Sequence, residues 1–170
     1  MPQDDALRLM DLERIRRLKA QYCRYIDTKQ WERLRAIFAP DVRFEGLGSA
    51  PSGAGLDDFI QGISSRMRTA VAIHHVHNPE IVFTGPDTAR GVWAMMDYVD
   101  WPDGPSPREA PGHRGFMGFG HYEEEYRRLD GDWKIGFLRL TRLRVDPILH
   151  DHPKPRRGLL AHSPDWLPAG

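Results

Sequence analysis

The 170-residue chain has a single cysteine, no excess of either charge and no long apolar run. One cysteine, Cys23, excludes an intramolecular disulfide and a cysteine-based zinc cluster, and it favours a reducing, cytoplasmic setting. With 24 Lys and Arg against 24 Asp and Glu, the chain lacks the basic excess that drives bulk binding to nucleic acid or an anionic membrane. No apolar run approaches the ~18 residues that span a bilayer. The acidic N-terminal segment lacks the apolar core of a secretory signal.

Familiar catalytic motifs are missing as well. The sequence has no glycine-rich phosphate loop, no nucleophile elbow and no His-Glu-x-x-His zinc motif. Its composition, 40% hydrophobic and 28% charged, is typical of a globular protein, and its length suits one domain. We therefore expect a single domain over residues 1–146 and a proline-rich tail over residues 147–170.

Apolar residues recur at helical spacing along the first half of the chain. The first helix should place Lys19 with its arginines on the faces away from the apolar stripe. Asp4 or Asp5 would cap this helix, and Pro40 would end the second one. The predicted order is helix, helix, strand, loop and helix, at about residues 4–27, 31–38, 42–45, 46–55 and 56–63.

The second half reads as four strands, at about 71–84, 89–101, 116–128 and 132–145. A long proline-rich connection, 102–115, separates the second strand from the third, and a lid and a surface insertion without function explain it equally well. Helices followed by antiparallel strands predict an α+β domain with helices on one face of a curved sheet. Such a sheet encloses a pocket suited to a small ligand.

Five ionisable or hydroxyl side chains stand where this pattern expects apolar ones: Tyr22, Asp27, His74, Asp97 and Arg142. An unpaired buried charge is costly, so such groups either pair or serve a function. A histidine backed by a carboxylate is an oriented general base. A phenol or a protonated buried acid can deliver a proton, and a guanidinium stabilises developing negative charge.

Each of the five also has a purely structural interpretation. Tyr22 could be a core phenol, Asp27 a helix end, and His74 a strand-end histidine bonded to backbone. Asp97 could occupy an exposed strand position, and Arg142 could form an ion pair with Glu124. On an ideal helix Tyr22 and Asp27 point about 140° apart. They face one cavity only from the two edges of the buried stripe, or if the helix unwinds near Asp27.

Two histidine pairs raise the question of a metal. His75 and His77 share one face of the predicted strand, opposite His74. With no cysteine partner and no obvious third ligand, we expect no metal there. His150 and His152 lie in the proline-rich tail, where we expect them to be exposed to solvent.

Three segments carry a resemblance to a known family: IRRLKAQYCRYIDTKQWERLRAIF from Ile15, HHVHNPEIVFTGPDTARGVW from His74, and HYEEEYRRLDGDWKI from His121. Over residues 10–146 the chain resembles the SnoaL-like branch of the nuclear transport factor two-like superfamily. This branch includes scytalone dehydratase, bile acid 7α-dehydratase, hexachlorocyclohexane dehydrochlorinase and polyketide cyclases. The resemblance implies a cone-shaped α+β barrel of a highly curved mixed or antiparallel sheet, no cofactor, and a homo-oligomer, either trimer or dimer.

The resemblance also implies site residues. The family's Tyr-x-x-x-x-Asp-x-x-x-Trp stretch corresponds to Tyr22, Asp27 and the tryptophan that follows, and its histidine corresponds to His74. Asp97 and Arg142 match an aspartate and an arginine of the bile acid dehydratase pattern. The long connection and the tail depart from those relatives, which leaves the identity of the substrate open.

The implied function is that of a cofactor-independent lyase of the dehydratase type. Its substrate would be a hydrophobic, ring-containing small molecule such as a steroid or polyketide, and a His–Asp dyad would be the base. One alternative is an isomerase or aldol cyclase that uses the same base. Another is a module that binds a small ligand or a protein without chemistry.

Overall fold

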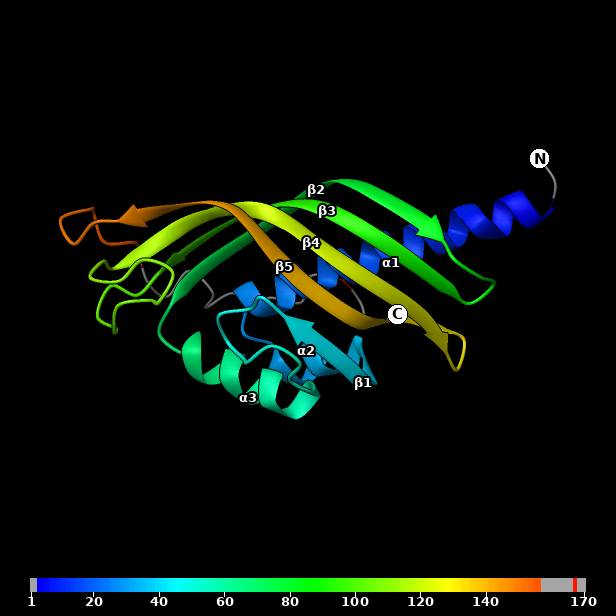
Figure 1. Cartoon of the computed structure of the whole chain (residues 1–170), viewed down its shortest axis with the longest axis horizontal. Coiled ribbons are helices and arrows are strands. Elements are labelled where there is room, and N and C mark those ends of the chain that lie inside the picture. The colour runs from blue at the N-terminus through cyan, green and yellow to red at the C-terminus, as the bar shows by residue number, and fades with distance from the viewer. Residues whose placement is uncertain (1–2, 157–166, 168–170) are drawn as a thin grey trace.

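The computed structural model describes residues 3–156 and 167 (Figure 1). The predicted order of helices first and strands second is confirmed. The elements are α1 (Gln3–Asp27), α2 (Trp31–Ala36), β1 (Phe38–Glu45), α3 (Leu56–Arg66), β2 (Val71–Phe83), β3 (Thr88–Asp100), β4 (Gly115–Leu129) and β5 (Asp132–Ile148).

The five strands form one mixed sheet in the order β1-β5-β4-β3-β2. β1 runs parallel to β5, and the other neighbours are antiparallel. The long strands β2 to β5 curve over the helices, which lie on the concave side (Figure 1). The highly curved sheet with N-terminal helices is thus confirmed, although among the described strands β1 and β2 remain edges and the sheet does not close.

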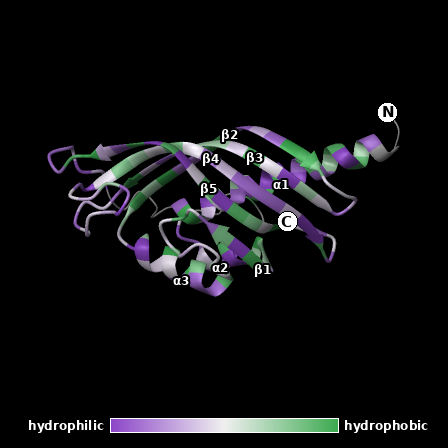
Figure 2. Cartoon of the chain, in the orientation of Figure 1, coloured by the Kyte–Doolittle hydropathy of each residue, from purple (hydrophilic) through white to green (hydrophobic). Residues whose placement is uncertain are grey.

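Side chains alternate along the strands, as a sheet with one buried face requires. In β3 every second residue from Ala89 to Val99 is buried, and Figure 2 shows apolar and polar residues alternating along the long strands. The core between the sheet and the helices is rich in aromatic rings. Phe44 of β1 stacks on Phe59 of α3 with 4.0 Å between ring centroids. This packing fixes α3 against the concave face.

Two predicted boundaries are wrong. Pro40 does not end a helix, because α2 ends at Ala36 and Pro40 lies inside β1. β1 is an edge strand, and its pairing with β5 is interrupted between Phe38 and Arg43, so the missing N–H of Pro40 costs no ladder hydrogen bond there. The first helix also begins earlier than an aspartate cap would place it, at Gln3.

The predicted connection between β3 and β4 is confirmed as residues 101–114, here called the 101–114 loop. Its base is firmly closed. The Trp101 N–H donates to the Arg114 carbonyl at 3.0 Å, and the Arg114 guanidinium donates to both Asp100 oxygens at 2.8 and 2.9 Å. Arg114 also donates to the His152 carbonyl at 2.7 Å, so one buried arginine ties the loop to the segment after β5.

The C-terminal part of the chain is described only in part. β5 continues to Ile148, two residues beyond the predicted domain end, and residues 157–166 and 168–170 of the predicted tail lie outside the described residues. His150 and His152 are exposed, as expected. Among the described helices, none is both long enough and apolar enough to cross a membrane.

Candidate functional site

A small cavity lies beneath β3, β4 and β5, bounded on the helical side by α1 and α3. Its free volume is about 40 Å³, which suits water rather than a larger ligand. Apolar side chains such as Ile26, Phe59 and Leu140 form much of the wall. The polar and charged side chains that line it are Tyr22, Ser49, Arg66, His74, Asp97, Glu109, Tyr122 and Arg142. Four of the five predicted site residues therefore meet at one cavity.

The fifth, Asp27, lies behind His74 and holds it in two ways. Asp27 Oδ1 is 2.6 Å from His74 Nδ1, and Oδ2 accepts a hydrogen bond from the His74 backbone N–H at 2.9 Å. The His74 side chain is 6% exposed and that of Asp27 is 23% exposed. A carboxylate on Nδ1 favours the tautomer with its proton on that nitrogen, which leaves Nε2 with a free electron pair. This is the arrangement of an oriented general base.

The position of Asp27 resolves the angular conflict with Tyr22. α1 continues as a regular helix to Asp27, where the Thr28 hydroxyl donates to the Arg24 carbonyl at 2.6 Å. Asp27 therefore faces a separate surface hollow with Cys23 and Thr28, whereas Tyr22 faces the cavity. His74 borders both spaces, so the carboxylate acts on the cavity only through the imidazole ring.

Asp97 and Arg142 pair directly across the cavity roof. Arg142 Nη1 and Nη2 donate to the two Asp97 oxygens, each at 2.6 Å, and Asp97 is 2% exposed. Burial lowers the pKa of Arg142, but the ion pair with Asp97 and the charge of Glu109 outweigh it and raise that pKa. Both Asp97 oxygens are already acceptors, so Asp97 is poorly placed to give up a proton.

Gly118 makes this pair possible. Asp97 on β3 lies opposite Gly118 on β4, so Arg142 must reach from β5 across β4. A Cβ atom at Gly118 would lie 1.8 Å from Arg142 Nη1 and 2.3 Å from Asp97 Oδ1. The missing side chain is thus the channel through which the guanidinium passes.

Two tyrosines add phenol groups to the wall. The ring of Tyr22 meets that of Tyr122 edge to face, with 5.6 Å between centroids. Burial is the main cause that raises the pKa of both phenols well above its ordinary value, so both stay protonated and able to donate. Tyr122 is missed by the sequence reasoning, because an aromatic residue in a strand is read as ordinary core.

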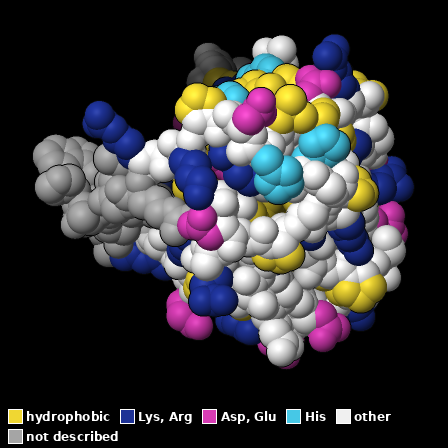
Figure 3. Space-filling view, turned by 90° about the vertical axis from the view of Figure 1, so that its left-hand side faces the viewer, with side chains coloured by type: hydrophobic (Ala, Val, Ile, Leu, Met, Phe, Trp, Pro, Cys, Tyr) yellow, Lys and Arg dark blue, Asp and Glu magenta, His cyan; other side chains and the backbone are white. Residues whose placement is uncertain are grey.

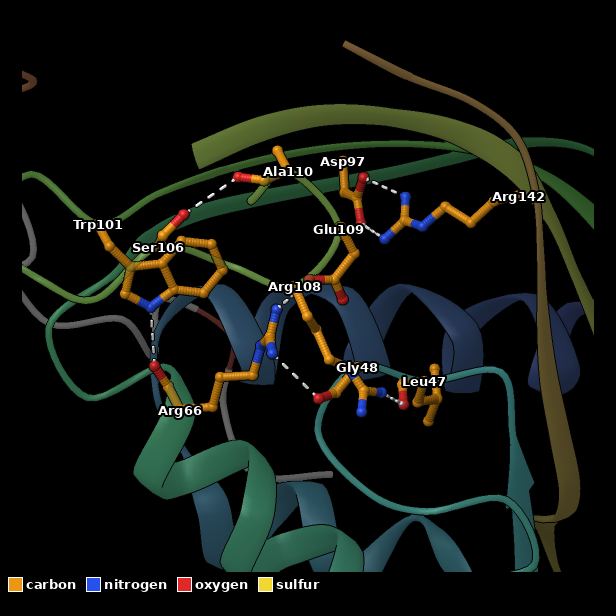
Figure 4. A network of polar contacts seen from close by, with 10 residues as sticks. All are labelled: Leu47, Gly48, Arg66, Asp97, Trp101, Ser106, Arg108, Glu109, Ala110 and Arg142. Carbon is orange, nitrogen blue, oxygen red and sulfur yellow. Dashed lines mark hydrogen bonds and ion pairs between the residues drawn. The ribbon is translucent and has the colours of Figure 1, made fainter. Parts of the chain in front are cut away.

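The 101–114 loop supplies the last charged group. Glu109 lies between the Asp97–Arg142 pair and Arg66 of α3, and its Oε2 accepts from Arg66 Nη2 at 2.6 Å (Figure 4). Arg66 Nη1 also donates to the Gly48 carbonyl at 3.1 Å. Neither Arg66 nor Glu109 is among the predicted site residues, because nothing in the sequence shows where the loop folds.

A second ionic group lies under the sheet, away from the cavity. Lys19 is fully buried, contrary to its expected place on a polar helix face, and its Nζ contacts Glu124 Oε1. Lys19 and Glu124 thereby remove the alternative in which Glu124 pairs with Arg142. The Lys19 Nζ also lies 4.1 and 3.5 Å from the ring centroids of Tyr22 and Tyr122. A charge expected in water is therefore balanced by one carboxylate and two aromatic faces.

The histidines beside His74 point elsewhere. His75 and His77 are exposed, on the opposite face of β2. Within the described part of the chain, no three histidine, cysteine, aspartate or glutamate side chains group closely enough to hold a metal ion. At the end of the molecule that carries the 101–114 loop, histidine and apolar side chains lie together at the surface, among charges of both signs (Figure 3).

Comparisons with known proteins show the family and the fold of the chain. The SnoaL-like domain matches residues 7–139. A protein named as a probable cyclase, FGR4 of Gibberella zeae, is 28% identical over 141 residues, which are 76% of this chain and 89% of that protein. Two solved structures share the fold. One is hexachlorocyclohexane dehydrochlorinase LinA type 2, with a TM-score of 0.71, 24% identity and coverage of 89% and 97% of the two chains. The other is LinA type 3 of Novosphingobium barchaimii, with a TM-score of 0.70, 23% identity and coverage of 89% of this chain and 99% of that one.

Proposed function

Because the chain belongs to the SnoaL-like domain family, we propose that it is a cofactor-independent lyase that removes water from a hydrophobic, ring-containing small molecule such as a steroid or polyketide. The observation that carries the proposal is the His74–Asp27 dyad, in which His74 lines the cavity. The similar proteins, a probable cyclase and a dehydrochlorinase, support chemistry on a small molecule.

In the proposed reaction, His74 Nε2 takes a proton from a carbon beside a carbonyl group. The C–H electron pair forms the new C=C bond as the C–O bond of the leaving hydroxyl breaks. Tyr22 gives its phenol proton to that hydroxyl, which leaves as water. The guanidinium of Arg142 stabilises the negative charge that develops on the carbonyl oxygen. Asp97 holds Arg142 in place, rather than acting as the acid, because both of its oxygens are bonded to the guanidinium.

A second candidate keeps the base and changes the outcome. An enolate formed by His74 can be protonated elsewhere or attack a second carbonyl, which gives an isomerase or an aldol cyclase. The cyclase name of the Gibberella zeae relative favours this alternative. Mass spectrometry of the product separates the reactions, since only dehydration loses one water.

The proposal is tested by removing the base while the fold is kept. Purified wild-type protein is incubated with a panel of hydroxylated steroids and polyketide-type ring ketones, and products are followed by mass. For any substrate that is turned over, His74→Ala and Asp27→Asn should lower kcat about 10³-fold, which is typical for loss of a general base. Circular dichroism should show unchanged folding.

His75→Ala is the matched control, because the neighbouring histidine lies on the exposed face of the same strand. It should retain wild-type activity. Activity of His74→Ala within a few-fold of wild type would contradict the proposed base. If the wild-type protein binds members of the panel but converts none, and binding is unaffected in His74→Ala, a binding module without chemistry is supported instead.

We also propose that the protein acts as a homo-oligomer, with the trimer favoured. Ile73, Met117 and Leu143 are exposed, and a second copy of the chain would cover such apolar side chains. Sedimentation equilibrium that finds only a 19.6 kDa species would contradict this proposal.

A further inference from the structure

The cavity is too small for the kind of substrate proposed. Its free volume is about 40 Å³, whereas sites that hold drug-sized ligands are roughly 300–1,000 Å³. A ring-containing molecule can therefore enter only if part of the wall moves. The part that moves, and what it leaves behind, then determine which substrates fit.

The tip of the 101–114 loop is a part of the wall that is held by side-chain contacts and not by a strand ladder or a helix face. β3, β4 and β5 are held by continuous ladders, and α3 packs its buried face against the core. Two arginine contacts join the loop to the cavity side: Arg66 with Glu109, and Arg108 Nη2 with the Leu47 carbonyl at 3.1 Å (Figure 4). Two exposed contacts join it to the segment after β5: Lys154 Nζ donates to Asp103 at 3.1 Å, and His150 Nε2 lies 3.2 Å from the Gly112 carbonyl. The base of the loop is clamped by Arg114 and Asp100, so the tip can lift about a fixed hinge.

Arg66 remains behind when the tip lifts. It is the last residue of α3, and its Nη1 donates to the Gly48 carbonyl, which does not belong to the loop. The close fit at Gly48 shows that the space is shaped for a carboxylate: a Cβ atom there would lie 2.0 Å from Glu109 Oε1 and 3.2 Å from Arg66 Cζ. The site thus accepts the carboxylate only because Gly48 has no side chain.

The charge balance then determines what replaces Glu109. With the loop down, Arg142 is paired with Asp97 and Arg66 with Glu109. In this arrangement the Arg66 side chain is 19% exposed. Lifting the tip would leave Arg66 facing the cavity without its carboxylate. A partly buried guanidinium without a counter-charge is unfavourable, and a carboxylate satisfies its fork-shaped donors best.

We propose that Glu109 occupies an anion subsite of the cavity, and that a carboxylate on the substrate replaces it on Arg66 when the 101–114 loop opens. The substrate class is then an apolar ring system that carries a carboxylate at one end. The ring lies against the apolar wall, with its reacting carbon toward His74. The inference rests on the proposed function, of which it specifies the substrate.

The test uses two probes that differ only in charge, naphthoate and naphthamide, with binding to the full-length protein measured by calorimetry. Glu109→Gln removes the competing anion and keeps the shape of the side chain. It should bind naphthoate about tenfold more tightly than wild type, because the Glu109 charge no longer competes with the probe carboxylate for Arg66 or repels it. The affinity for naphthamide should change by less than about twofold, because the neutral amide neither competes as a counter-charge for Arg66 nor is repelled by Glu109.

Two further variants make the assignment specific to Arg66. Arg66→Gln should lose the preference for naphthoate, and Arg66→Lys should keep part of it. Glu125→Gln, on the exposed side of β4, is the matched control and should bind both probes as wild type does. If Arg66→Gln does not fold, the Glu109→Gln comparison decides alone.

Three results would overturn the inference. Equal gains for both probes in Glu109→Gln would make the loop a steric cover without an anion subsite. Retained naphthoate preference in Arg66→Gln would place the subsite elsewhere. Failure of every variant to bind either probe would show that the cavity does not open to a ring.

The proposed function is kept separate by repeating the titrations in His74→Ala protein. The binding shift should persist there even though turnover is lost. If the wild-type protein shows the binding shift but turns over no substrate, the proposed function is contradicted and the anion subsite is kept.

Discussion

Two ion pairs lie under the same sheet and differ in what surrounds them. Lys19 and Glu124 are both completely buried, and the two aromatic rings over the Lys19 ammonium complete its shell. Arg142 of the Asp97–Arg142 pair is 21% exposed and borders the cavity. The first pair has no space beside it for a substrate, whereas the second has one.

The hydrogen bonds of the Lys19–Glu124 pair extend into a closed chain. Lys19 contacts one Glu124 oxygen and the Tyr126 hydroxyl donates to the other, while the Trp93 indole donates to that hydroxyl at 2.7 Å. Each of these polar side chains thus has a buried side chain of the same group as its ion-pair or hydrogen-bond partner. We infer that this group specifies and stabilises the fold, and that the pair at the cavity serves the site.

Breaking the Lys19–Glu124 pair should have the largest effect on stability. Lys19→Met leaves the Glu124 carboxylate buried without its cation, which should lower the free energy of unfolding by about 3–5 kcal/mol. Urea unfolding followed by circular dichroism measures this change. The double variant Lys19→Met/Glu124→Gln removes both charges and keeps an acceptor for Tyr126, so it should recover much of the loss. A single variant as stable as wild type would show that the pair adds nothing.

Disturbing the Asp97–Arg142 pair should destabilise the fold less than breaking the Lys19–Glu124 pair, but it should lower activity more. Gly118→Ala places a methyl group where the Arg142 guanidinium passes, so it should destabilise the fold by about 1–3 kcal/mol and separate Arg142 from Asp97. On any substrate that the wild type converts, kcat should fall by about 10²-fold.

Gly55→Ala is the matched control for Gly118→Ala. The nearest atom to a Cβ at Gly55 is 3.8 Å away, which is an ordinary contact distance. Because Gly55 is the N-cap residue of α3, where alanine is less favourable than glycine, this control should lower stability by about 1 kcal/mol. It should leave turnover unchanged. Unchanged turnover in Gly118→Ala would remove Arg142 from the proposed mechanism.

Alkaline pH should lower the stability of the fold gradually, through Tyr126 of the buried group around Lys19 and Glu124. Burial is the first cause that raises the pKa of Tyr126 well above its ordinary value, and the adjacent Glu124 carboxylate adds to it. Above the unfolded-state pKa of about 10, the unfolded chain loses this proton and the folded chain keeps it, so stability is full below that pH and falls as pH rises.

The expected slope is about 1.4 kcal/mol per pH unit for each such tyrosine. Melting temperatures between pH 9 and about pH 11.5 measure the fall. Tyr126→Phe should show a shallower slope than wild type. An identical slope in that variant would mean that Tyr126 does not titrate on unfolding.

The parts of the structure that sequence reasoning predicts well are those set by local pattern. The strands β2 to β5 follow from alternation and turn residues, and polar residues at core positions mark His74 and Asp97. Lys19 escapes this reasoning, because its partner is 105 residues away and the aromatic rings that shield its charge come from two elements. The pairing of Asp97 with Arg142 depends on the missing side chain at Gly118. The hydrophobic pattern of the strands does not reveal that a glycine leaves space for a neighbouring side chain. Glu109 depends on the path of a loop that has no periodicity.

The double contact of Asp27 with His74 has a consequence for how the chain folds. One carboxylate oxygen accepts from the imidazole and the other from the backbone N–H of the same residue. A slip of one residue along β3 in one direction would turn His74 outward and present Ile73 to Asp27 instead. Ile73 would satisfy only the backbone contact. The end of α1 therefore disfavours this slipped register of β2, because the register loses the imidazole hydrogen bond and, with it, the oriented base.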